Sequence, residues 1–518
     1  MKNIIKLILL SVVVLGMSSC TEEKVLDLKP INNVSEADAF TTPSLIASYM
    51  NGVYNAAAIG QYNATTPNGG RGYVWGAAFV EQGEARGEDV VNMATFYQLT
   101  YTATYDATSA NNVYYWIDGY RLINRCNLMI EGCNDAVSKG VITQAVANDY
   151  IGQCKFLRAI THFELLTYFA RPYNFTAGAT HPGVPYREVG VNTAAEITSE
   201  TAKPRNTVAE CYTKVLSDLT DAETLIISTG FTPRVIAKAT KQAAIAFKTR
   251  VYLHKRDWAN VIAEGSKLTG YALTADPATP FVLASNLNNT ESIFSIQHAA
   301  TANPGVNAAL ASILKNRALV CISPIIWRDP EWLADDKRRV EGKFIYTASG
   351  IKYTNKYTDI VNLTDASPVI RYAEVVLNMA EAQARLATPN LTTALTLLNS
   401  VRNRSLADPA TQAYTLAGLN TPTLMVKAIL KERRIEFLQE GRRWSDIHRL
   451  QGDDIAPIAG VPAKVNNGTP SVNAFILGNS YVIPLGVAAI PSSDFRFLWP
   501  IPQVELNTNP GLGQNPNW

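Results

Sequence analysis

The sequence predicts a mainly α-helical body in which helices pair as antiparallel hairpins, with long irregular insertions and minor β-strands. Three observations predict this fold. Apolar residues recur at three- and four-residue spacing in several long segments. Short polar stretches separate these segments in pairs, and small and large apolar residues are mixed within them, as at Ala244, Ala246 and Tyr252. Helix pairs of this kind stack in tetratricopeptide arrays, whose period is about 34 residues.

The helical segments follow one another in pairs along the chain. Asn206 is the expected N-cap of the segment that starts at residue 207, with Glu210 in its first turns. The predicted helices are residues 114–134 with 149–169, 207–227 with 238–254, a short helix at 257–268, and a third group at 369–386, 391–404 and 424–438.

Long segments rich in Gly, Asn and Thr separate the helix groups. Loops of such length are uncommon in a compact domain unless they carry function, so we expect the binding surface there. These insertions are residues 61–73, 178–201, 271–291 and 452–484. Alternating patterns at 291–297 and 480–484 predict two short strands.

The N-terminus predicts export and a lipid anchor. Lys2 and Lys6 precede an apolar run at residues 7–15, which is too short to span a bilayer as a helix and is typical of a signal peptide. The run ends in small residues before Cys20, which resembles the lipobox of bacterial lipoproteins. We therefore expect a signal peptide at 1–19, acylation of Cys20 and a tether at 20–35; the alternative is that Cys20 is an ordinary thiol.

Composition excludes several kinds of partner. The net charge of +2, from 46 basic and 44 acidic residues, gives no electrostatic footprint for nucleic acid. The five scattered histidines have no ligand at metal-binding spacing, so neither a metal nor another cofactor is expected. Five cysteines remain beside Cys20, an odd number that predicts buried thiols rather than a disulfide framework.

Six motifs resemble the SusD/RagB family of outer-membrane nutrient-binding lipoproteins, in order along nearly the whole mature chain. The one small departure is His162, which stands where the family usually has tyrosine. The motifs are Phe156-Leu157-Arg158-Ala159, Arg205-Asn206-Thr207-Val208, Arg371-Tyr372-Ala373-Glu374, Asn399-Ser400-Val401-Arg402-Asn403-Arg404, Glu432-Arg433-Arg434-Ile435-Glu436 followed by Glu440-Gly441-Arg442, and Pro500-Ile501-Pro502 with Gln514-Asn515-Pro516.

The resemblance implies one α-rich body with about four tetratricopeptide-like helix pairs, an N-terminal region at 36–230 and a C-terminal region at 231–518. It also implies a lipoprotein of the outer membrane that faces the exterior, binds glycan and delivers it to a SusC-like TonB-dependent transporter, without catalysis. The RagB branch binds peptides, which is the alternative function.

Three glutamates on one predicted helix superficially resemble a glycosidase carboxylate pair. Glu432, Glu436 and Glu440 recur every four residues. Catalysis requires one carboxyl with a raised pKa, whereas nearby Arg433 and Arg443 favour ionised carboxylates. We expect structural ion pairs here and also between Arg371 and Glu374 and between Glu381 and Arg404, so loss of the glutamates would reduce stability.

Two stretches combine aromatic and polar residues as a glycan-binding surface requires. Aromatic faces pack on sugar C–H groups, and a few polar groups bond the hydroxyls. The candidate ligand-binding residues are Tyr73, Trp75, Arg86, Glu88, Asp89, Asn92, Tyr97 and Tyr101 in the first stretch, which also holds Phe96 and Tyr105, and Trp327 and Trp332 in the second. The alternative is that these rings belong to the core or support the loops, as we expect for Trp116 and Tyr120 on a helix.

Overall fold

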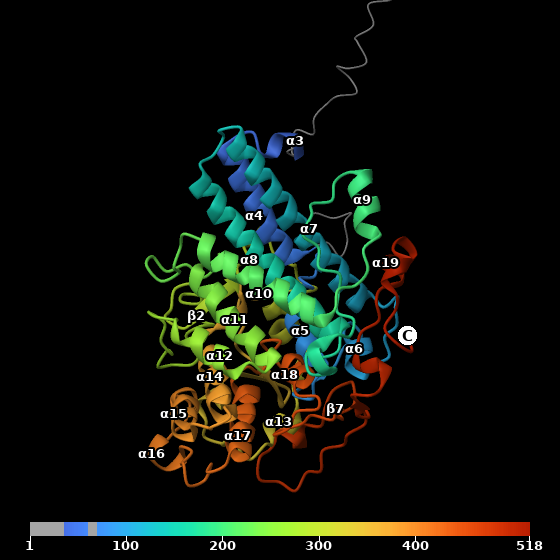
Figure 1. Cartoon of the computed structure of the whole chain (residues 1–518). Coiled ribbons are helices and arrows are strands. Elements are labelled where there is room, and N and C mark those ends of the chain that lie inside the picture. Colours follow the sequence, from blue (N-terminus) through green and yellow to red (C-terminus); the bar gives the residue numbers. More distant parts are fainter. Residues whose placement is uncertain (1–35, 61–69) are drawn as a thin grey trace, which may run out of the picture.

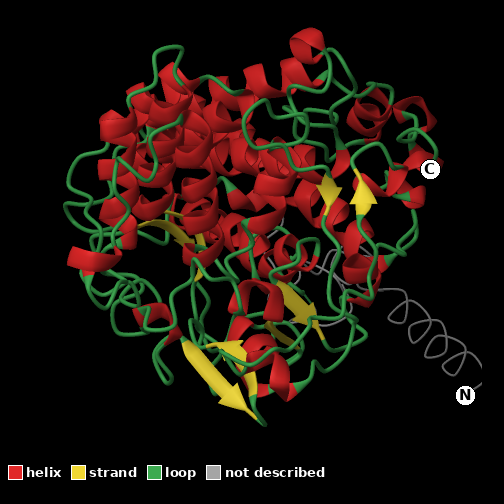
Figure 2. Cartoon of the chain, turned by 90° about the horizontal axis from the view of Figure 1, so that it is seen from below, coloured by secondary structure: helices red, strands yellow, loops and turns green. Residues whose placement is uncertain are grey.

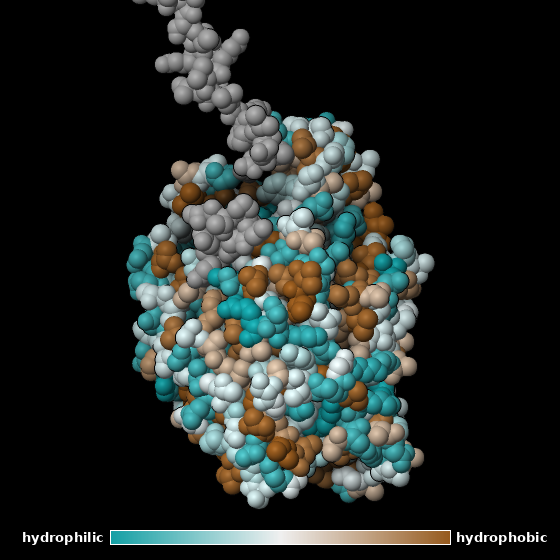
Figure 3. All heavy atoms as spheres, turned by 180° about the vertical axis from the view of Figure 1, so that it is seen from behind, coloured by the Kyte–Doolittle hydropathy of each residue, from teal (hydrophilic) through white to brown (hydrophobic). Residues whose placement is uncertain are grey.

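The structure is a computed structural model, and it describes residues 36–60 and 70–518. The predicted signal peptide, Cys20, the tether and most of the 61–73 insertion lie outside the described residues. Within the described ranges, no helix combines the length and apolar character that crossing a bilayer requires. In the view of Figure 3, apolar and polar atoms are interspersed over the surface.

A stack of antiparallel helices forms one half of the molecule, as the apolar spacing predicts (Figures 1 and 2). α8 packs between α7 and α10, α11 packs between α10 and α12, and α14 contacts α12, α15 and α17. The stack consists of α4 (Pro43–Ile59), α7 (Ala110–Ser138), α8 (Gln144–Phe169), α10 (Val208–Leu225), α11 (Lys241–Lys255), α12 (Trp258–Ser266), α14 (Tyr372–Arg385), α15 (Leu391–Arg402) and α17 (Pro422–Glu436).

Short helices lie in the connecting segments. α9 crosses the 178–201 insertion, and a π-helix, η2 (Ser312–Asn316), precedes the second candidate stretch. The others are α3 (Glu36–Ala39), α5 (Ala77–Ala85), α6 (Gln98–Thr102), α9 (Ala194–Thr201), α13 (Pro324–Trp327), α16 (Pro409–Gln412), α18 (Arg443–Arg449) and α19 (Gln503–Thr508).

The strands form separate two-stranded antiparallel sheets that are dispersed among the loops (Figure 2). The pairs are β1 (Val90–Asn92) with β3 (Val320–Ile322), β2 (Ser292–Ile296) with β6 (Ser367–Arg371), β4 (Ile345–Ala348) with β5 (Ile351–Thr354), and β7 (Gly460–Val461) with β8 (Ile490–Pro491). The strand predicted at 291–297 is confirmed as β2.

The strand predicted at 480–484 is wrong, because this segment has no pairing partner and forms an irregular loop. Its central Val482 is 85% exposed, whereas a half-buried strand would cover one face.

Helix α10 begins one residue later than the sequence predicts. Thr207, not Asn206, is the N-cap: its hydroxyl accepts from the Glu210 backbone N–H, and the Glu210 carboxylate accepts in return from the Thr207 N–H. Asn206 instead accepts from the Tyr186 N–H at 2.9 Å and so ties the preceding loop to the helix start.

α5 is buried along its whole length, in contact with a turn from the far end of the chain. A Cβ at Gly83 would lie 2.4 Å from the Gly441 carbonyl oxygen, so only glycine permits this approach. Glu84 accepts from the backbone N–H groups of Gly441 and Arg442 at 2.8 and 3.1 Å. Burial, followed by the charge of Asp89, raises the pKa of Glu84 to about 7.

The motif glutamates at the end of α17 lie in a buried ion network. The Arg371 guanidinium contacts the carboxylates of Glu291 and Glu436 at 2.7 Å and of Glu440 at 2.9 Å. Burial opposes ionisation of Glu436, but Arg404, Arg371 and Arg338 outweigh it and hold its pKa well below the ordinary value. Glu436 therefore favours the ionised form, as in a structural ion pair, whereas a catalytic acid requires a raised pKa.

Two predicted ion pairs in this region are wrong in their partners. Glu374 pairs with Arg250 at 2.6 Å rather than with Arg371. Glu381 pairs with Arg385 and Arg449, at 2.9 and 2.7 Å, rather than with Arg404. Arg385 is a neighbour of Glu381 on α14, four residues further on, whereas Arg250 and Arg449 come from other helices that the fold brings against α14.

The five cysteines of the described chain are buried free thiols, as the odd count predicts. Trp116 is 1% exposed and belongs to the core as expected. Tyr120 is half-buried, and its hydroxyl donates to the Pro185 carbonyl at 2.8 Å.

Candidate functional site

All ten side chains that the sequence nominates for ligand contact are buried, with at most 5% of their surface exposed. A ring packed on both faces cannot also stack on a sugar. The structure therefore gives these residues supporting contacts, and the exposed part of the surface must come from their neighbours. Direct ligand contact by any of the ten stays a prediction.

The aromatic residues of the first stretch are fixed by hydrogen bonds inside the molecule. The Trp75 indole N–H donates to the Thr161 hydroxyl at 3.0 Å, and the Tyr101 hydroxyl donates to the Val465 carbonyl at 2.8 Å. The Tyr73 hydroxyl donates to the Asn111 side-chain oxygen at 3.0 Å. These contacts hold the segment before α7 in one conformation.

The charged and polar residues of the first stretch join distant segments. Glu88 pairs with Arg443 at 2.6 Å, and Asp89 pairs with Arg434. Arg86 donates to the Phe497 carbonyl at 2.6 Å, with its guanidinium 3.8 Å from the Trp444 ring centroid. The Asn92 side-chain amide donates to the Asn467 side-chain oxygen at 2.6 Å.

The second stretch is also internal. The Trp327 indole N–H donates to the Phe475 carbonyl at 3.0 Å, and Trp332 packs edge-on against Trp327 at 5.5 Å. The Arg339 guanidinium lies 4.5 and 4.2 Å from the two ring centroids. This pair of rings supports the loop around it.

Half-exposed rings lie directly beside the buried ones. Phe96 packs edge-on against Tyr97 at 4.6 Å, and the Arg71 guanidinium lies 5.2 Å from its ring centroid. Tyr114 stacks on Tyr73 at 6.1 Å. Buried aromatic residues thus form a rigid base under rings that reach the surface.

The π-helix η2 and the β4–β5 hairpin extend this surface. Lys315 leaves η2 with its ammonium 5.5 Å from the half-exposed ring of Tyr346, and the exposed Arg317 follows at the helix end. Tyr346 packs on Tyr353 at 6.1 Å, and the Tyr353 hydroxyl lies 4.0 Å from the Met93 sulfur.

A backbone hydrogen bond connects the Phe96 side of this surface with the Tyr346 side. The Met93 N–H donates to the Leu319 carbonyl at 2.9 Å, immediately after η2. Burial raises the pKa of Tyr97 well above its ordinary value, and Arg71 and Arg317 are both near enough to oppose that rise. We name this region the basic aromatic surface and define it by Arg71, Phe96, Lys315, Arg317 and Tyr346.

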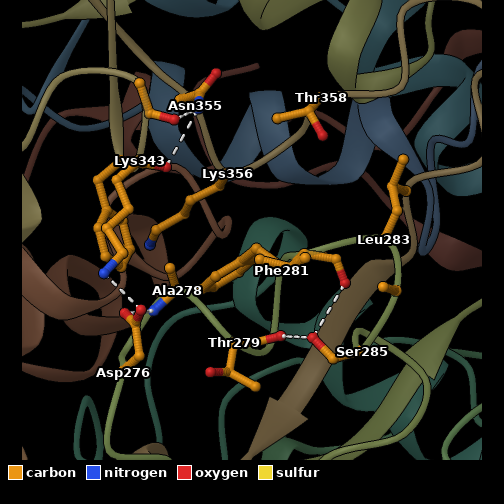
Figure 4. A pocket seen from close by; sticks show the side chains of 14 residues that line it. Asp276, Ala278, Thr279, Phe281, Leu283, Ser285, Lys343, Asn355, Lys356 and Thr358 are labelled. Carbon is orange, nitrogen blue, oxygen red and sulfur yellow. Dashed lines mark hydrogen bonds and ion pairs between the residues drawn. The ribbon is translucent and has the colours of Figure 1, made fainter.

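A pocket of about 650 Å³ lies beside the hairpin, and the predicted 271–291 insertion forms one of its walls (Figure 4). Lys343 points toward Asp276, and the two form an ion pair of 2.5 Å in which both side chains are more than two-fifths exposed. Phe281 lines the interior, and Val282 and Leu283 are exposed. The insertion therefore contributes a cavity, as its length predicts.

Asn355 connects the pocket with the basic aromatic surface. It lines the pocket, donates to the Gly342 carbonyl at 2.8 Å and accepts from the Lys315 ammonium at 2.7 Å. Lys356 also lines the pocket, but its ammonium donates to the Leu438 carbonyl and to Glu440, at 3.0 and 2.6 Å.

Sequence reasoning missed Lys315, Arg317 and Tyr346. Two signals could have identified them. Lys315-Asn316-Arg317 is a polar run between apolar segments, and Tyr346 and Tyr353 flank a Ser349-Gly350 turn as facing strand residues would. The burial of the nominated rings had no comparable signal, because it depends on segments that lie far from them in the sequence, such as those near residues 161 and 475.

The fold and the surface define a class: a helical-repeat protein whose loop face carries the candidate binding surface. Two family models match this chain, one described as the SusD family over residues 335–518 and one described as "starch-binding associating with outer membrane" over residues 24–253. The chain belongs to the SusD/RagB family, as its motifs predict.

Individual relatives agree with this assignment. SusD-like protein P2 of Formosa agariphila is 23% identical over 455 residues, 77% of this chain and 79% of that protein. A SusD superfamily crystal structure from Bacteroides fragilis is 29% identical, with a TM-score of 0.72 over 92% of this chain and all of that one. A surface glycan-binding protein A from Bacteroides uniformis shares the fold at 18% identity, with a TM-score of 0.68 over 92% and 99% of the two chains.

Proposed function

We propose that this chain binds glycan at the basic aromatic surface and delivers it to a SusC-like TonB-dependent transporter. The observation that carries the proposal is the set of half-exposed rings, Phe96 and Tyr346, held on a rigid buried base beside hydrogen-bond donors. Such rings pack against sugar C–H groups, and the donors bond hydroxyls. Binding without catalysis is supported by the motif glutamates, whose carboxylates are paired with arginines or with Lys356.

The anchor and the hand-over belong to the same proposal. Cys20, acylated after removal of residues 1–19, would hold the protein on the outer membrane facing the exterior. Weak binding sites on a tethered protein can retain a long polymer, because each further contact with the same polymer is effectively intramolecular. The division into regions at 36–230 and 231–518, within one body, is part of this proposal.

The anchor is tested by fractionation. Changing Cys20 to Ser is expected to release the protein from the outer-membrane fraction, whereas the same change at the buried Cys321 leaves it there. Retention of the Cys20→Ser protein on the membrane would exclude the lipid anchor. Co-purification of a β-barrel protein with the anchored chain tests the transporter partnership.

Glycan binding is tested with the chain that begins at Thr21, screened against plant, host and microbial polysaccharides and a peptide library. Phe96→Ala and Tyr346→Ala are each expected to weaken binding of the recognised polysaccharide about tenfold, the loss of one stacking contact of about 1 kcal/mol or slightly more. Phe175→Ala is the control, because that ring is 56% exposed outside this surface.

Peptide capture is the alternative function, and the pocket is the observation that favours it. An apolar lip beside an exposed Asp276–Lys343 ion pair is a charged pocket of the kind that accepts a peptide side chain. Binding of peptides without any glycan in the same screen would assign this chain the peptide function and remove the glycan proposal.

A further inference from the structure

Two cations of the basic aromatic surface have no acidic partner among the described residues. The Lys315 ammonium donates to the Asn355 side-chain oxygen at 2.7 Å, and Arg317 donates to the Asn307 side-chain oxygen at 3.1 Å. Both acceptors are neutral amides. The two positive charges are therefore oriented by neutral groups and form no ion pair with a described carboxylate.

The nearby acidic groups form no ion pair with these cations. Burial raises the pKa of Asp365 and the charge of Lys315 opposes that rise, but the Asp365 carboxylate accepts from the backbone N–H groups of Thr358 and Asp359, both at 2.9 Å. Glu341 lies 3.7 Å from Lys352 and accepts from the Thr347 N–H at 2.7 Å, so its charge is already engaged. Asp276 is paired with Lys343. Under the surface, burial, followed by the charge of Glu84, raises the pKa of Glu81 well above its ordinary value, which disfavours the charged form of that carboxyl.

The backbone around these cations has an uncommon conformation. η2 is a π-helix, a rare form that appears mostly as a single turn within an α-helix and is frequent at functional sites. Ala318 follows it with a φ of 51°, in the left-handed region that favours glycine. The surrounding structure must hold such a conformation at some cost, and this one places Lys315 and Arg317 at the surface.

We propose that the glycan bound at this surface is anionic, carrying carboxylate or sulfate-ester groups that pair with Lys315 and Arg317. This inference rests on the proposed function and names its ligand class. Phe96 and Tyr346 contact the sugar rings, and the two cations contact charged substituents. The planar guanidinium of Arg317 presents a donor fork that matches two oxygens of either group.

The ligand side is tested with matched polymers and the chain that begins at Thr21. One arm compares polygalacturonate with the same polymer after reduction of its carboxyls to primary alcohols. The other compares a sulfated galactan with its desulfated form. Removal of the charge is expected to weaken binding at least tenfold in the arm that carries the recognised group, and added salt should weaken only the anionic form.

The protein side is tested with Lys315→Gln combined with Arg317→Gln. This double variant is expected to bind the anionic polymer about tenfold more weakly and with a smaller salt dependence. Lys427→Gln is the matched control, because Lys427 is an exposed lysine on α17 that also has no ion pair among the described residues. Its binding should equal that of the unchanged protein.

The outcomes separate this inference from the proposed function. Equal binding of the charged and neutral polymers, with no effect of the double variant, overturns the anionic ligand but leaves glycan capture standing. Failure to bind any polysaccharide of the broader screen overturns both. If the double variant unfolds, the comparison of polymers on the unchanged protein still decides.

Discussion

At the scale of single residues, Arg371 shows how the family motifs act in this fold. Its guanidinium reaches three carboxylates from two distant segments: Glu291 before β2, and Glu436 and Glu440 at and just after the end of α17. A buried ion network of this kind adds little net stability over apolar packing, but loss of one member leaves charges buried without a partner. Arg371 therefore favours the packing of the segment that holds Glu291 against the end of α17.

Arg371→Met is expected to lower the free energy of unfolding by about 3–5 kcal/mol, because Glu436 and Glu440 lose a buried counter-charge. Urea denaturation measures the loss. Lys139→Met, which removes an exposed pair with Asp135, should leave the midpoint unchanged. Equal midpoints for all three proteins would contradict a structural role of the network.

Glu84 predicts a pH dependence of stability. Because its pKa rises from 4.5 unfolded to about 7 folded, the folded state binds the proton more tightly, and stability falls as pH rises from 4.5 to 7. Glu84→Gln keeps an oxygen acceptor for Gly441 and Arg442 but cannot ionise. The stability of the unchanged protein relative to this variant should fall by about 3 kcal/mol across that interval. A constant difference from pH 4.5 to 8 would contradict the raised pKa.

At the scale of elements, helix starts are set by local side chains. The capping box of Thr207 and Glu210 satisfies N–H groups that the first turn of α10 leaves unpaired. A second box, Thr193 with Glu196, starts α9 within an otherwise irregular insertion. Short-range signals of this kind decide where helices begin.

Thr207→Ala is expected to lower the free energy of unfolding by about 1 kcal/mol, the usual cost of losing an N-cap. Thr213→Ala on the same helix is the control, since that hydroxyl is exposed and only bonds back to the Ala209 carbonyl. Thermal unfolding compares the two variants, and an equal change in both would show that the cap contributes nothing particular.

Periodicity predicted the helices well because a helix that buries one face must repeat its apolar residues at that spacing. The strand predicted at 480–484 is wrong because an alternating pattern over five residues does not by itself provide a second strand to pair with. For the candidate site, the sequence indicates the right region of the chain, but the residues it nominates are buried beside the half-exposed rings. Trp75 and Trp327 are covered by segments near residues 161 and 475, which are distant in the sequence, and no local pattern carries that information.

At the scale of the whole molecule, the two ends of the chain are interlocked. α5 packs against the turn after α17, Arg86 donates to the Phe497 carbonyl, and Glu88 pairs with Arg443. The family models match these regions separately, at residues 24–253 and 335–518. In this fold each region buries polar groups of the other.

A chain that ends at residue 253 is therefore expected not to fold as a stable unit. It would expose α5 and leave Glu88 and Asp89 without Arg434 and Arg443. Limited proteolysis and the near-ultraviolet circular dichroism of this fragment are the measurements. A protease-resistant fragment with native aromatic signals would show instead that the N-terminal region folds alone.

The contact of Gly83 with Gly441 also constrains the order of events during biogenesis. The two residues are separated by most of the chain, so the buried position of α5 cannot be completed until residue 441, late in the sequence, is available to pack against it. Such high contact order slows folding and leaves apolar segments transiently unprotected. On the export route proposed above, the protein is therefore expected to depend on holding chaperones more strongly than helical-repeat proteins whose contacts are all between neighbours.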